Sequence, residues 1–174
     1  MEYTFTLKYQ LSENDCNHDE LLERLGAADC DDALVGVGQP GRIALEFTRE
    51  AKNAEAALLS ALMDVKRCIP STKLIEAAPD FVGLTDVAEF AGVTRQNMRK
   101  LMVNHCTSFP APVHEGSSAI WHLADVLTWL KARGTYKLEQ KILEVALTAK
   151  QINLAKEARQ LAPQIQREVQ ALVA

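Results

Sequence analysis

The chain has 174 residues and a formal net charge of −4 at pH 7, and 48% of its residues are hydrophobic. That hydrophobic content can fill one large core or two small ones, which excludes a chain that is disordered throughout. The sequence has no basic-then-apolar leader and no run of about 18 apolar residues, so we expect a cytoplasmic protein without membrane association.

The spacing of cysteines and histidines argues against disulfides and metal sites. Four cysteines are widely scattered without a CxxC pair, which predicts reduced thiols: Cys16, Cys30, Cys68 and Cys106. Four potential metal ligands fall within one stretch, yet their spacing fits no metal site: His105, Cys106, His114 and His122. We therefore expect no bound metal.

The acidic balance of the chain is confined to its first part. Residues 1–79 carry 8 basic and 14 acidic side chains, whereas residues 80–134 carry 5 of each. Residues 135–174 carry 6 basic and 4 acidic side chains. Because the first part repels polyanions, any contact with nucleic acid must come from a local patch further along the chain.

Residues 1–79 alternate between the periodicities of strands and helices. Alternation predicts strands at Tyr3–Tyr9, in ALVGV, in RIALEFT and at Thr72–Ala77, and the spacing of apolar residues predicts helices at Asp19–Leu25 and Lys52–Cys68. The order β-α-β-β-α-β is that of a ferredoxin-like domain. Such a fold hosts many functions and does not itself indicate one.

The stretch GVGQPG, from Gly36 to Gly41, has the spacing of a dinucleotide-binding glycine loop. Such a loop needs a helix that opens at its end, because the helix N-terminus supplies the amides that bind phosphate. The residues that follow Gly41 alternate as a strand does, so we expect a β-hairpin turn at Gly38–Gly41 and no cofactor. Asp31 and Asp32 are interpreted as a turn rather than a catalytic pair, and no nucleophile–base pair indicates an enzyme.

The segment GLTDVAEFAGVTRQNMRKLM predicts two short helices joined by a tight turn. Thr85 is a suitable N-cap for the first helix, which has an apolar stripe at Leu84, Val87, Ala88 and Ala91. Gly92 lies where that helix would end in a left-handed turn, and Thr94 can cap the second helix. The second helix buries three apolar residues: Met98, Leu101 and Met102. This arrangement is typical of a helix-turn-helix motif.

The opposite face of the second helix has the side chains that a DNA major groove requires. Arg99 can donate two hydrogen bonds to a guanine edge, and Gln96 or Asn97 can pair with adenine. Arg95 and Lys100 can reach phosphates. An ordinary pair of packed helices with a solvated basic face is the alternative interpretation.

The residues that follow predict a wing and a third helix. FPAPV (Phe109–Val113) is extended, His114–Ser118 forms a turn, and Ala119–Trp121 returns as a strand. His122 caps the third helix, and His105 either meets a phosphate or lies on the surface. The two helices and the wing together give the expected DNA contacts: Thr94, Arg95, Gln96, Asn97, Arg99, Lys100, His114, Ser117 and Ser118.

Three segments resemble the AlpA/excisionase-like branch of the MerR-type winged helix-turn-helix family. They are LTDVAEFAGVTRQNMRKLM, FPAPV and IWHLADVLTWLKAR, and the resemblance covers residues 82–133. It implies a winged helix-turn-helix that binds double-stranded DNA in a sequence-specific manner, as phage-related regulators and excision factors do.

The tail, residues 135–174, predicts a long helix with two apolar seams. The first consists of Leu138, Ile142, Val145, Ala149 and Ile152, and the second of Leu154, Ala158, Leu161 and Ile165. Pro163 begins a new short helix or kinks the first one. We expect this helix to form a homodimer, and the alternative is that it folds back on its own domain.

The sequence therefore predicts an α+β protein with three parts. These are a ferredoxin-like domain at 1–79 that serves as a sensor or assembly module, a winged helix-turn-helix domain at 80–134, and a helical dimerisation segment at 135–174. The favoured function is a homodimeric transcriptional repressor whose first domain binds a small ligand or a protein. The alternatives are an antitoxin-like or complex-forming interaction module and, least favoured, an enzyme.

Overall fold

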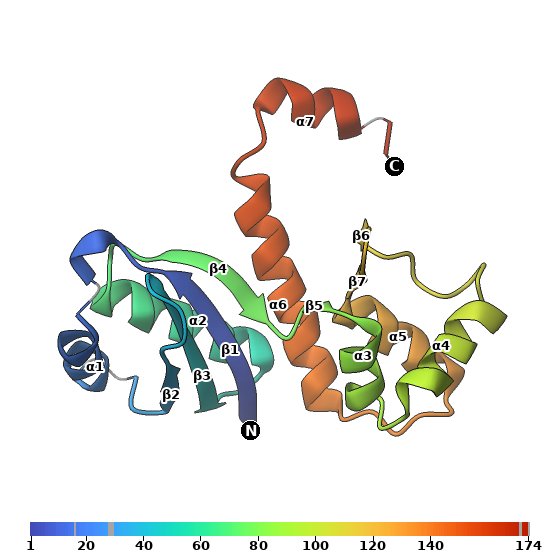
Figure 1. The fold of residues 1–174 in the computed structure, drawn as a ribbon, viewed down its shortest axis with the longest axis horizontal. Helices are drawn as coiled ribbons and strands as arrows, with labels where there is room; N and C mark the ends of the chain where they lie inside the picture. The colour runs from blue at the N-terminus through green and yellow to red at the C-terminus, as the bar shows by residue number, and fades with distance from the viewer. Residues whose placement is uncertain (16, 28–29, 171, 174) are drawn as a thin grey trace.

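The structure, a computed structural model, describes residues 1–15, 17–27, 30–170 and 172–173. Helices and antiparallel sheets form two units that lie on either side of one long helix (Figure 1). The thiol predicted at Cys16 lies outside the described residues. Cys30, Cys68 and Cys106 are free thiols.

The first unit contains a sheet with strand order β2-β3-β1-β4, in which every neighbouring pair is antiparallel. The predicted strands and helices of this unit are confirmed, with shifts of one or two residues at their ends. A short 3-10 turn at Glu13–Asp15 follows the first strand. The elements are β1 (Glu2–Gln10), α1 (His18–Gly26), β2 (Ala33–Gly36), β3 (Arg42–Glu50), α2 (Ala54–Cys68) and β4 (Lys73–Ala78).

Side-chain alternation explains why β1 and β3 lie at the centre of this sheet. Tyr3, Phe5, Leu7 and Tyr9 are buried on one face of β1, and Phe5 is paired with Phe47 of β3. The two phenyl rings are stacked with their centroids 5.4 Å apart. The helix α2 covers this face of the sheet and buries its alanine-rich side there.

The glycine-rich stretch is a hairpin turn, as predicted. Strand β2 ends at Gly36 and β3 begins at Arg42, whose amide donates to the carbonyl of Gln39 over 3.1 Å. Gly41 has a φ of 73°, a left-handed conformation that favours glycine. A strand and not a helix follows the turn, so the arrangement lacks the helix N-terminus on which a phosphate loop depends.

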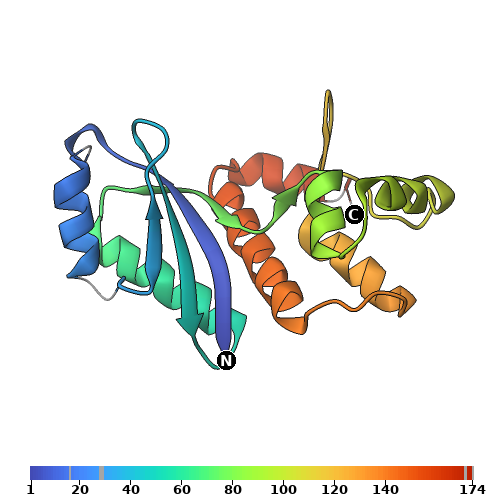
Figure 2. The same cartoon turned by 60° about the horizontal axis from the view of Figure 1, so that its bottom comes forward.

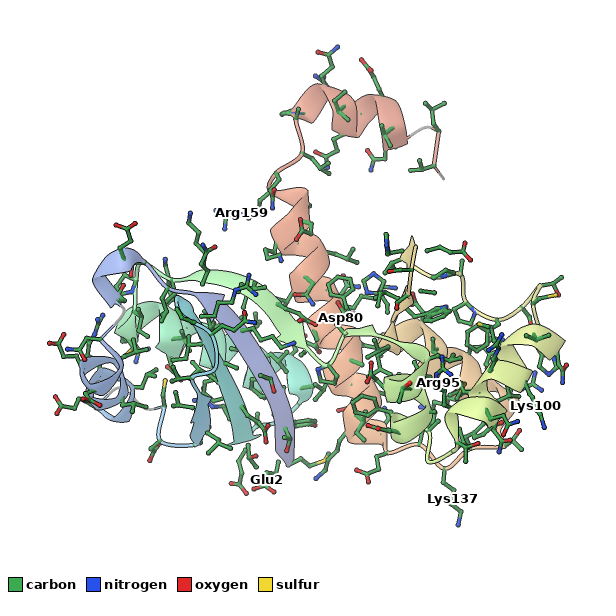
Figure 3. The ribbon with its side chains drawn as sticks, viewed as in Figure 1. Glu2, Asp80, Arg95, Lys100, Lys137 and Arg159 are labelled. Atoms are coloured by element: carbon green, nitrogen blue, oxygen red, sulfur yellow. The ribbon has the colours of Figure 1, made fainter. Side chains whose placement is uncertain are left out.

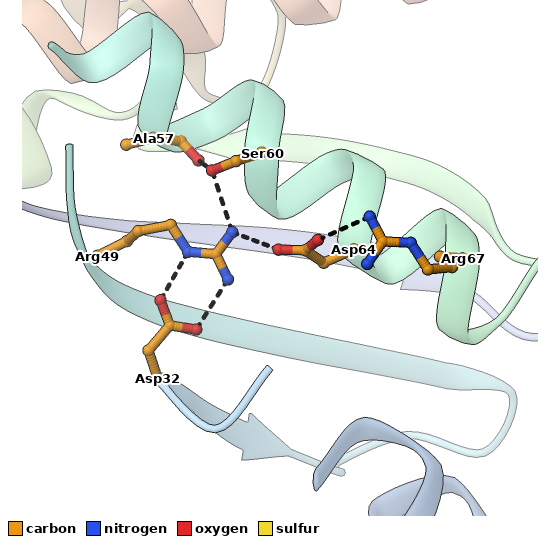
Figure 4. Close-up of polar contacts among 6 residues, drawn as sticks. All are labelled: Asp32, Arg49, Ala57, Ser60, Asp64 and Arg67. Carbon is orange, nitrogen blue, oxygen red and sulfur yellow. Dashed lines mark hydrogen bonds and ion pairs between the residues drawn. The ribbon is translucent and has the colours of Figure 1, made fainter. Parts of the chain in front are cut away.

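Asp32 lies in the predicted turn and has a structural role there (Figure 4). Its two carboxylate oxygens accept hydrogen bonds from Arg49 over 2.6 and 2.9 Å. Arg49 also donates to Asp64 over 2.6 Å and to Ser60 over 3.1 Å, which ties β3 to α2. The hydrogen bonds to Asp32 and Asp64 raise the pKa of the Arg49 guanidinium above its ordinary value. Arg49 therefore stays positively charged and holds β3 and α2 together.

Burial suppresses the ionisation of the thiols in this unit. Cys30 and Cys68 are buried, and desolvation, reinforced by the charge of Asp64, raises the pKa of the Cys30 thiol to about 11. Desolvation also raises the pKa of the Cys68 thiol. A neutral buried thiol is a poor nucleophile, so these two cysteines have the character of core residues.

The Tyr9 hydroxyl is the only buried side-chain polar atom without a hydrogen-bond partner in the described residues. Because an unpaired buried hydroxyl destabilises the native state, we expect Tyr9→Phe to raise the free energy of unfolding by about 1 kcal/mol. Urea denaturation followed by circular dichroism measures this change.

Tyr3→Phe is the matched control for that prediction, since the Tyr3 hydroxyl donates to Glu144 over 3.1 Å. Its loss is expected to lower the free energy of unfolding by about 0.5–1.5 kcal/mol. A Tyr9→Phe protein that is destabilised as much as the control would contradict the prediction.

The second unit contains helices and a small sheet with strand order β5-β7-β6. The sequence did not predict β5, and His114 and Glu115 belong to a strand rather than to the turn. The turn is shorter because the pairing of His114 with Ile120 and of Glu115 with Ala119 extends the ladder toward the tip. The elements are β5 (Phe81–Val82), α3 (Leu84–Phe90), α4 (Arg95–Asn104), β6 (His114–Glu115), β7 (Ala119–His122) and α5 (Leu123–Arg133).

The tail forms α6 (Gln140–Ala158) and α7 (Pro163–Gln170), and α6 lies between the two units (Figures 1 and 2). Leu143 and Ala146 of α6 are buried in the core of the second unit, whereas Val145 and Ala149 are buried in the core of the first. The first apolar seam is thus covered by the chain itself. This agrees with the alternative interpretation, in which the tail folds back on its own domain. Pro163 begins a new helix, as one of the two predictions for it stated.

A buried polar network joins the two units at α6. The Asn153 amide group pairs with both backbone groups of Ala77 over 2.8 and 2.9 Å and donates to Asp80 over 2.8 Å. The second Asp80 oxygen lies 2.7 Å from Nδ1 of His122. His122 takes the N-cap position of α5, as predicted, but its side chain makes no capping bond. Its ring is instead engaged by the fully buried Asp80.

Candidate nucleic-acid interface

The angle between α3 and α4 is set by a tight turn at residues 91–94. Gly92 has a φ of 66°, and the amide of Val93 donates back to Ala88 over 2.9 Å. The Thr94 hydroxyl accepts a hydrogen bond from the backbone amide of Asn97 over 3.2 Å and so caps α4, as predicted. These bonds satisfy backbone groups that would otherwise be left free at the two helix ends.

The predicted N-cap of α3 is wrong by two residues. Gly83 takes the cap position, and the Asp86 carboxylate accepts a hydrogen bond from the backbone amide of Gly83 over 2.8 Å. Asp86 is the third residue of the helix, from which an acidic side chain reaches back to the cap. Thr85 is therefore in the first turn of α3 and is exposed.

The apolar side of α4 packs into the core of the second unit. Met98 is fully buried, and Leu101 and Met102 pack partly buried against the same core. The α3 residues that they meet include Val87 and Ala88, which are also buried. With this side occupied, the orientation of the opposite side of α4 is fixed.

The opposite side of α4 is exposed and basic. We call it the α4 face, and it consists of Arg95, Gln96, Asn97, Arg99 and Lys100. Within the described part of the chain, none of these five side chains takes part in a hydrogen bond or ion pair. Three cations are thus presented to solvent without a carboxylate partner, and Figure 3 shows Arg95 and Lys100 on this helix.

The α4 face lies at the end of the molecule that is remote from the acidic first unit. Both views show α4 at one end and the β1–β4 sheet at the other, with α6 between them (Figures 1 and 2). The chain's own acidic sheet therefore does not cover the basic side chains. A polyanion can approach this end without meeting the excess negative charge of residues 1–79.

The β6–β7 hairpin carries the three remaining predicted contact residues. His114, Ser117 and Ser118 are exposed, and the hairpin projects from the unit (Figure 2). A groove of about 620 Å³ separates its base from the C-terminal end of α4, and Val103 and Trp121 both line it. Because Val103 also borders the α4 face, the face and the hairpin belong to one continuous surface.

Aromatic contacts hold the segment between α4 and the hairpin in place. Phe109 meets Trp121 and Trp129 edge to face, with centroid distances of 6.3 and 5.1 Å. The indole nitrogen of Trp121 donates to the carbonyl of Pro110 over 3.0 Å. The FPAPV segment thus acts as a rigid spacer that fixes the hairpin relative to α4.

His105, whose role the sequence left open, has a clear partner. The Nε2 atom of His105 lies 3.0 Å from the guanidinium of Arg133, which in turn stacks 4.7 Å above Trp129. The sequence did not predict Arg133 as a neighbour of α4. Its position in the last turn of α5, next to an aromatic residue, is the signal that could have indicated it.

No group of three or more His, Cys, Asp or Glu side chains in the described ranges is placed to hold a metal ion. No helix in these ranges has the length and hydropathy needed to cross a membrane. Comparison with known protein families, curated proteins and solved structures finds no match to this chain.

Proposed function

We propose that the chain is a sequence-specific DNA-binding transcriptional regulator. The observation that carries the proposal is the α4 face, with three cations and two amides that are exposed, have no partner among the described residues, and are held on a buried scaffold. Two helices, a turn, a hairpin and a third helix follow one another as in a winged helix-turn-helix of the AlpA/excisionase-like family. The antiparallel order β2-β3-β1-β4 likewise supports a ferredoxin-like first domain.

In this proposal α4 enters the major groove of double-stranded DNA. Arg99 binds a guanine edge through two hydrogen bonds, and Gln96 or Asn97 reads adenine. Arg95, Lys100 and the amides near Thr94 bind phosphates, which position the helix without reading sequence. The hairpin residues His114, Ser117 and Ser118 contact the sugar-phosphate backbone beside the groove. A repressor would act by occupying a promoter in this manner.

The proposal is tested by titrating the protein against fluorescent genomic fragments at about 50 mM and about 200 mM salt. We expect a subset of fragments to bind tightly and the logarithm of the affinity to fall steeply with the logarithm of salt concentration. Equal affinity for all fragments would contradict sequence-specific regulation. Binding that is insensitive to salt would exclude phosphate contacts altogether.

We also propose that the chain forms a homodimer, through apolar residues in the last part of the tail. The first seam is covered within the chain, but Leu154, Leu161, Ile165 and Val169 each expose 40–52% of their surface. They lie at the end of α6, in the connection between the two helices and on α7, and α7 buries none of its residues (Figure 1). A second copy that pairs with them would place two α4 faces on one palindromic site.

We expect a variant that ends at Arg159 to be folded and monomeric, whereas the full chain is a dimer. Light scattering measures the mass, and circular dichroism checks that the fold is retained. The full-length double variant Leu161→Ser, Ile165→Ser is the control, because it removes apolar contacts without shortening the chain. A full chain that is itself monomeric would contradict dimerisation.

A further inference from the structure

A groove of about 920 Å³ lies where β4 and the end of β1 meet α2 and the last turns of α6. Its apolar lining includes Leu62, Leu74, Ile75 and Ile152, which come from three different elements. The volume falls within the range of pockets that hold small organic ligands, which is about 300–1,000 Å³. We call it the β4–α6 groove.

The charged residues that line the β4–α6 groove are all basic. Four basic residues line it, and no carboxylate does so: Lys66, Lys73, Lys156 and Arg159. They come from α2, β4 and the end of α6, so the fold brings them together from distant parts of the chain. Lys66 and Lys73 belong to residues 1–79, the part of the chain that has an excess of acidic residues.

Two of the four cations have no partner of their own in the part of the chain that the structure describes. Lys66 donates to the carbonyl of Pro70, and Lys156 donates to that of Ile75 and pairs with Glu157 over 2.9 Å. Lys73 and Arg159 make no side-chain hydrogen bond or ion pair within the described residues. Figure 3 shows Arg159 at the end of α6, directed toward the side on which β4 lies. An anion placed between them would meet two unneutralised charges.

We propose that the β4–α6 groove binds a small organic anion with an apolar body. Arg159 and Lys73 bind the acidic group, since the guanidinium can donate two parallel hydrogen bonds to a carboxylate. The aliphatic residues on the groove floor bury the body of the ligand and exclude water from it. The combination selects against inorganic anions, which cannot use the floor, and against neutral apolar molecules, which leave the cations unpaired.

Such a ligand would act on the α4 face through α6, and this consequence alone rests on the proposed DNA-binding function. Ile152 of the groove directly precedes Asn153, which is bonded to Ala77 and Asp80. One turn earlier, Lys150 pairs with Asp125 of α5 over 2.6 Å. A ligand that draws the end of α6 toward β4 therefore pulls on contacts of both units.

The test uses anilinonaphthalene sulfonate, a fluorescent apolar anion, titrated into the full chain without DNA. The groove variant is Lys73→Glu, Arg159→Glu, and the matched control is Lys137→Glu, Lys141→Glu, which changes the charge equally at exposed lysines elsewhere. We expect saturable binding that weakens at least about tenfold in the groove variant. The control is expected to bind like the wild type, and decanoate should displace the dye where inorganic phosphate does not.

Equal binding by the two variants would overturn the site, provided that circular dichroism shows both to be folded. Displacement by inorganic phosphate as effective as that by decanoate would overturn the apolar part of the assignment. A separate titration with a DNA fragment, with and without decanoate, tests the coupling. Decanoate that binds without changing DNA affinity refutes the coupling and leaves the site intact, and a chain that binds no DNA at all refutes only the proposed function.

Discussion

Arg99→Ala is expected to weaken binding to the preferred DNA site by about 1–3 kcal/mol, which corresponds to roughly 5- to 150-fold in Kd. Arg99 is exposed on α4 with no partner in the described part of the chain, so its loss removes the proposed contact to DNA without breaking one within the protein. The substitution should also relax the sequence preference at one base pair, because a base contact carries specificity.

Fluorescence anisotropy with the preferred fragment and with a scrambled fragment measures both effects. Lys100→Ala is the informative comparison, since a phosphate contact should weaken binding to both fragments alike and reduce the salt slope by about 0.9. Arg42→Ala, at an exposed position of β3, is the control for the loss of one positive charge. The assignment of α4 as the recognition helix is wrong if Arg99→Ala binds both fragments as the Arg42→Ala protein does.

Asp80→Ala is expected to lower the free energy of unfolding by about 3–5 kcal/mol. The Asp80 side chain is fully buried and bonded to both Asn153 and His122. Its removal leaves the buried His122 ring without this partner and takes one of its hydrogen bonds from Asn153, which keeps those to Ala77. Unsatisfied groups of this kind destabilise a fold more than the loss of an exposed ion pair does. The loss should affect both units, because each one supplies part of the network.

Urea denaturation of the wild type and the variant measures this effect. Asp125→Ala is the matched control: its carboxylate pairs with Lys150 of α6, but 42% of the side chain is exposed. We expect this control to change the free energy of unfolding by about 1 kcal/mol or less. A cost for Asp80→Ala as small as that of the control would show that the network does not join the units.

Local sequence patterns were sufficient to predict most of the elements of both units. The alternation in β1 and β3 reflects one face buried under α2, and the Pro40–Gly41 pair restricts the backbone to a turn. The exposed side of α4 was also predictable, because Met98 fixes the rotation of the helix and places Arg99 opposite. In these cases the residues that decide the structure are neighbours in sequence.

Contacts between distant residues were not predictable in the same way. An apolar seam on a helix indicates that something covers it, but Val145 and Leu143 give no sign that two different cores of the same chain do so. The two residues of β5 are too few for a periodicity. The pairing of Asp80 with Asn153, and the approach of Arg159 to β4, depend on the placement of α6, which no local pattern encodes.

The position of α6 has a consequence for the order in which the protein matures on the ribosome. Synthesis runs from the N-terminus, so both sheets and α3 to α5 emerge before α6 does. Until α6 follows, the first core lacks Val145 and Ala149 and the second lacks Leu143 and Ala146. A nascent chain therefore has two incomplete hydrophobic cores, and both are completed when the single helix α6 packs against them.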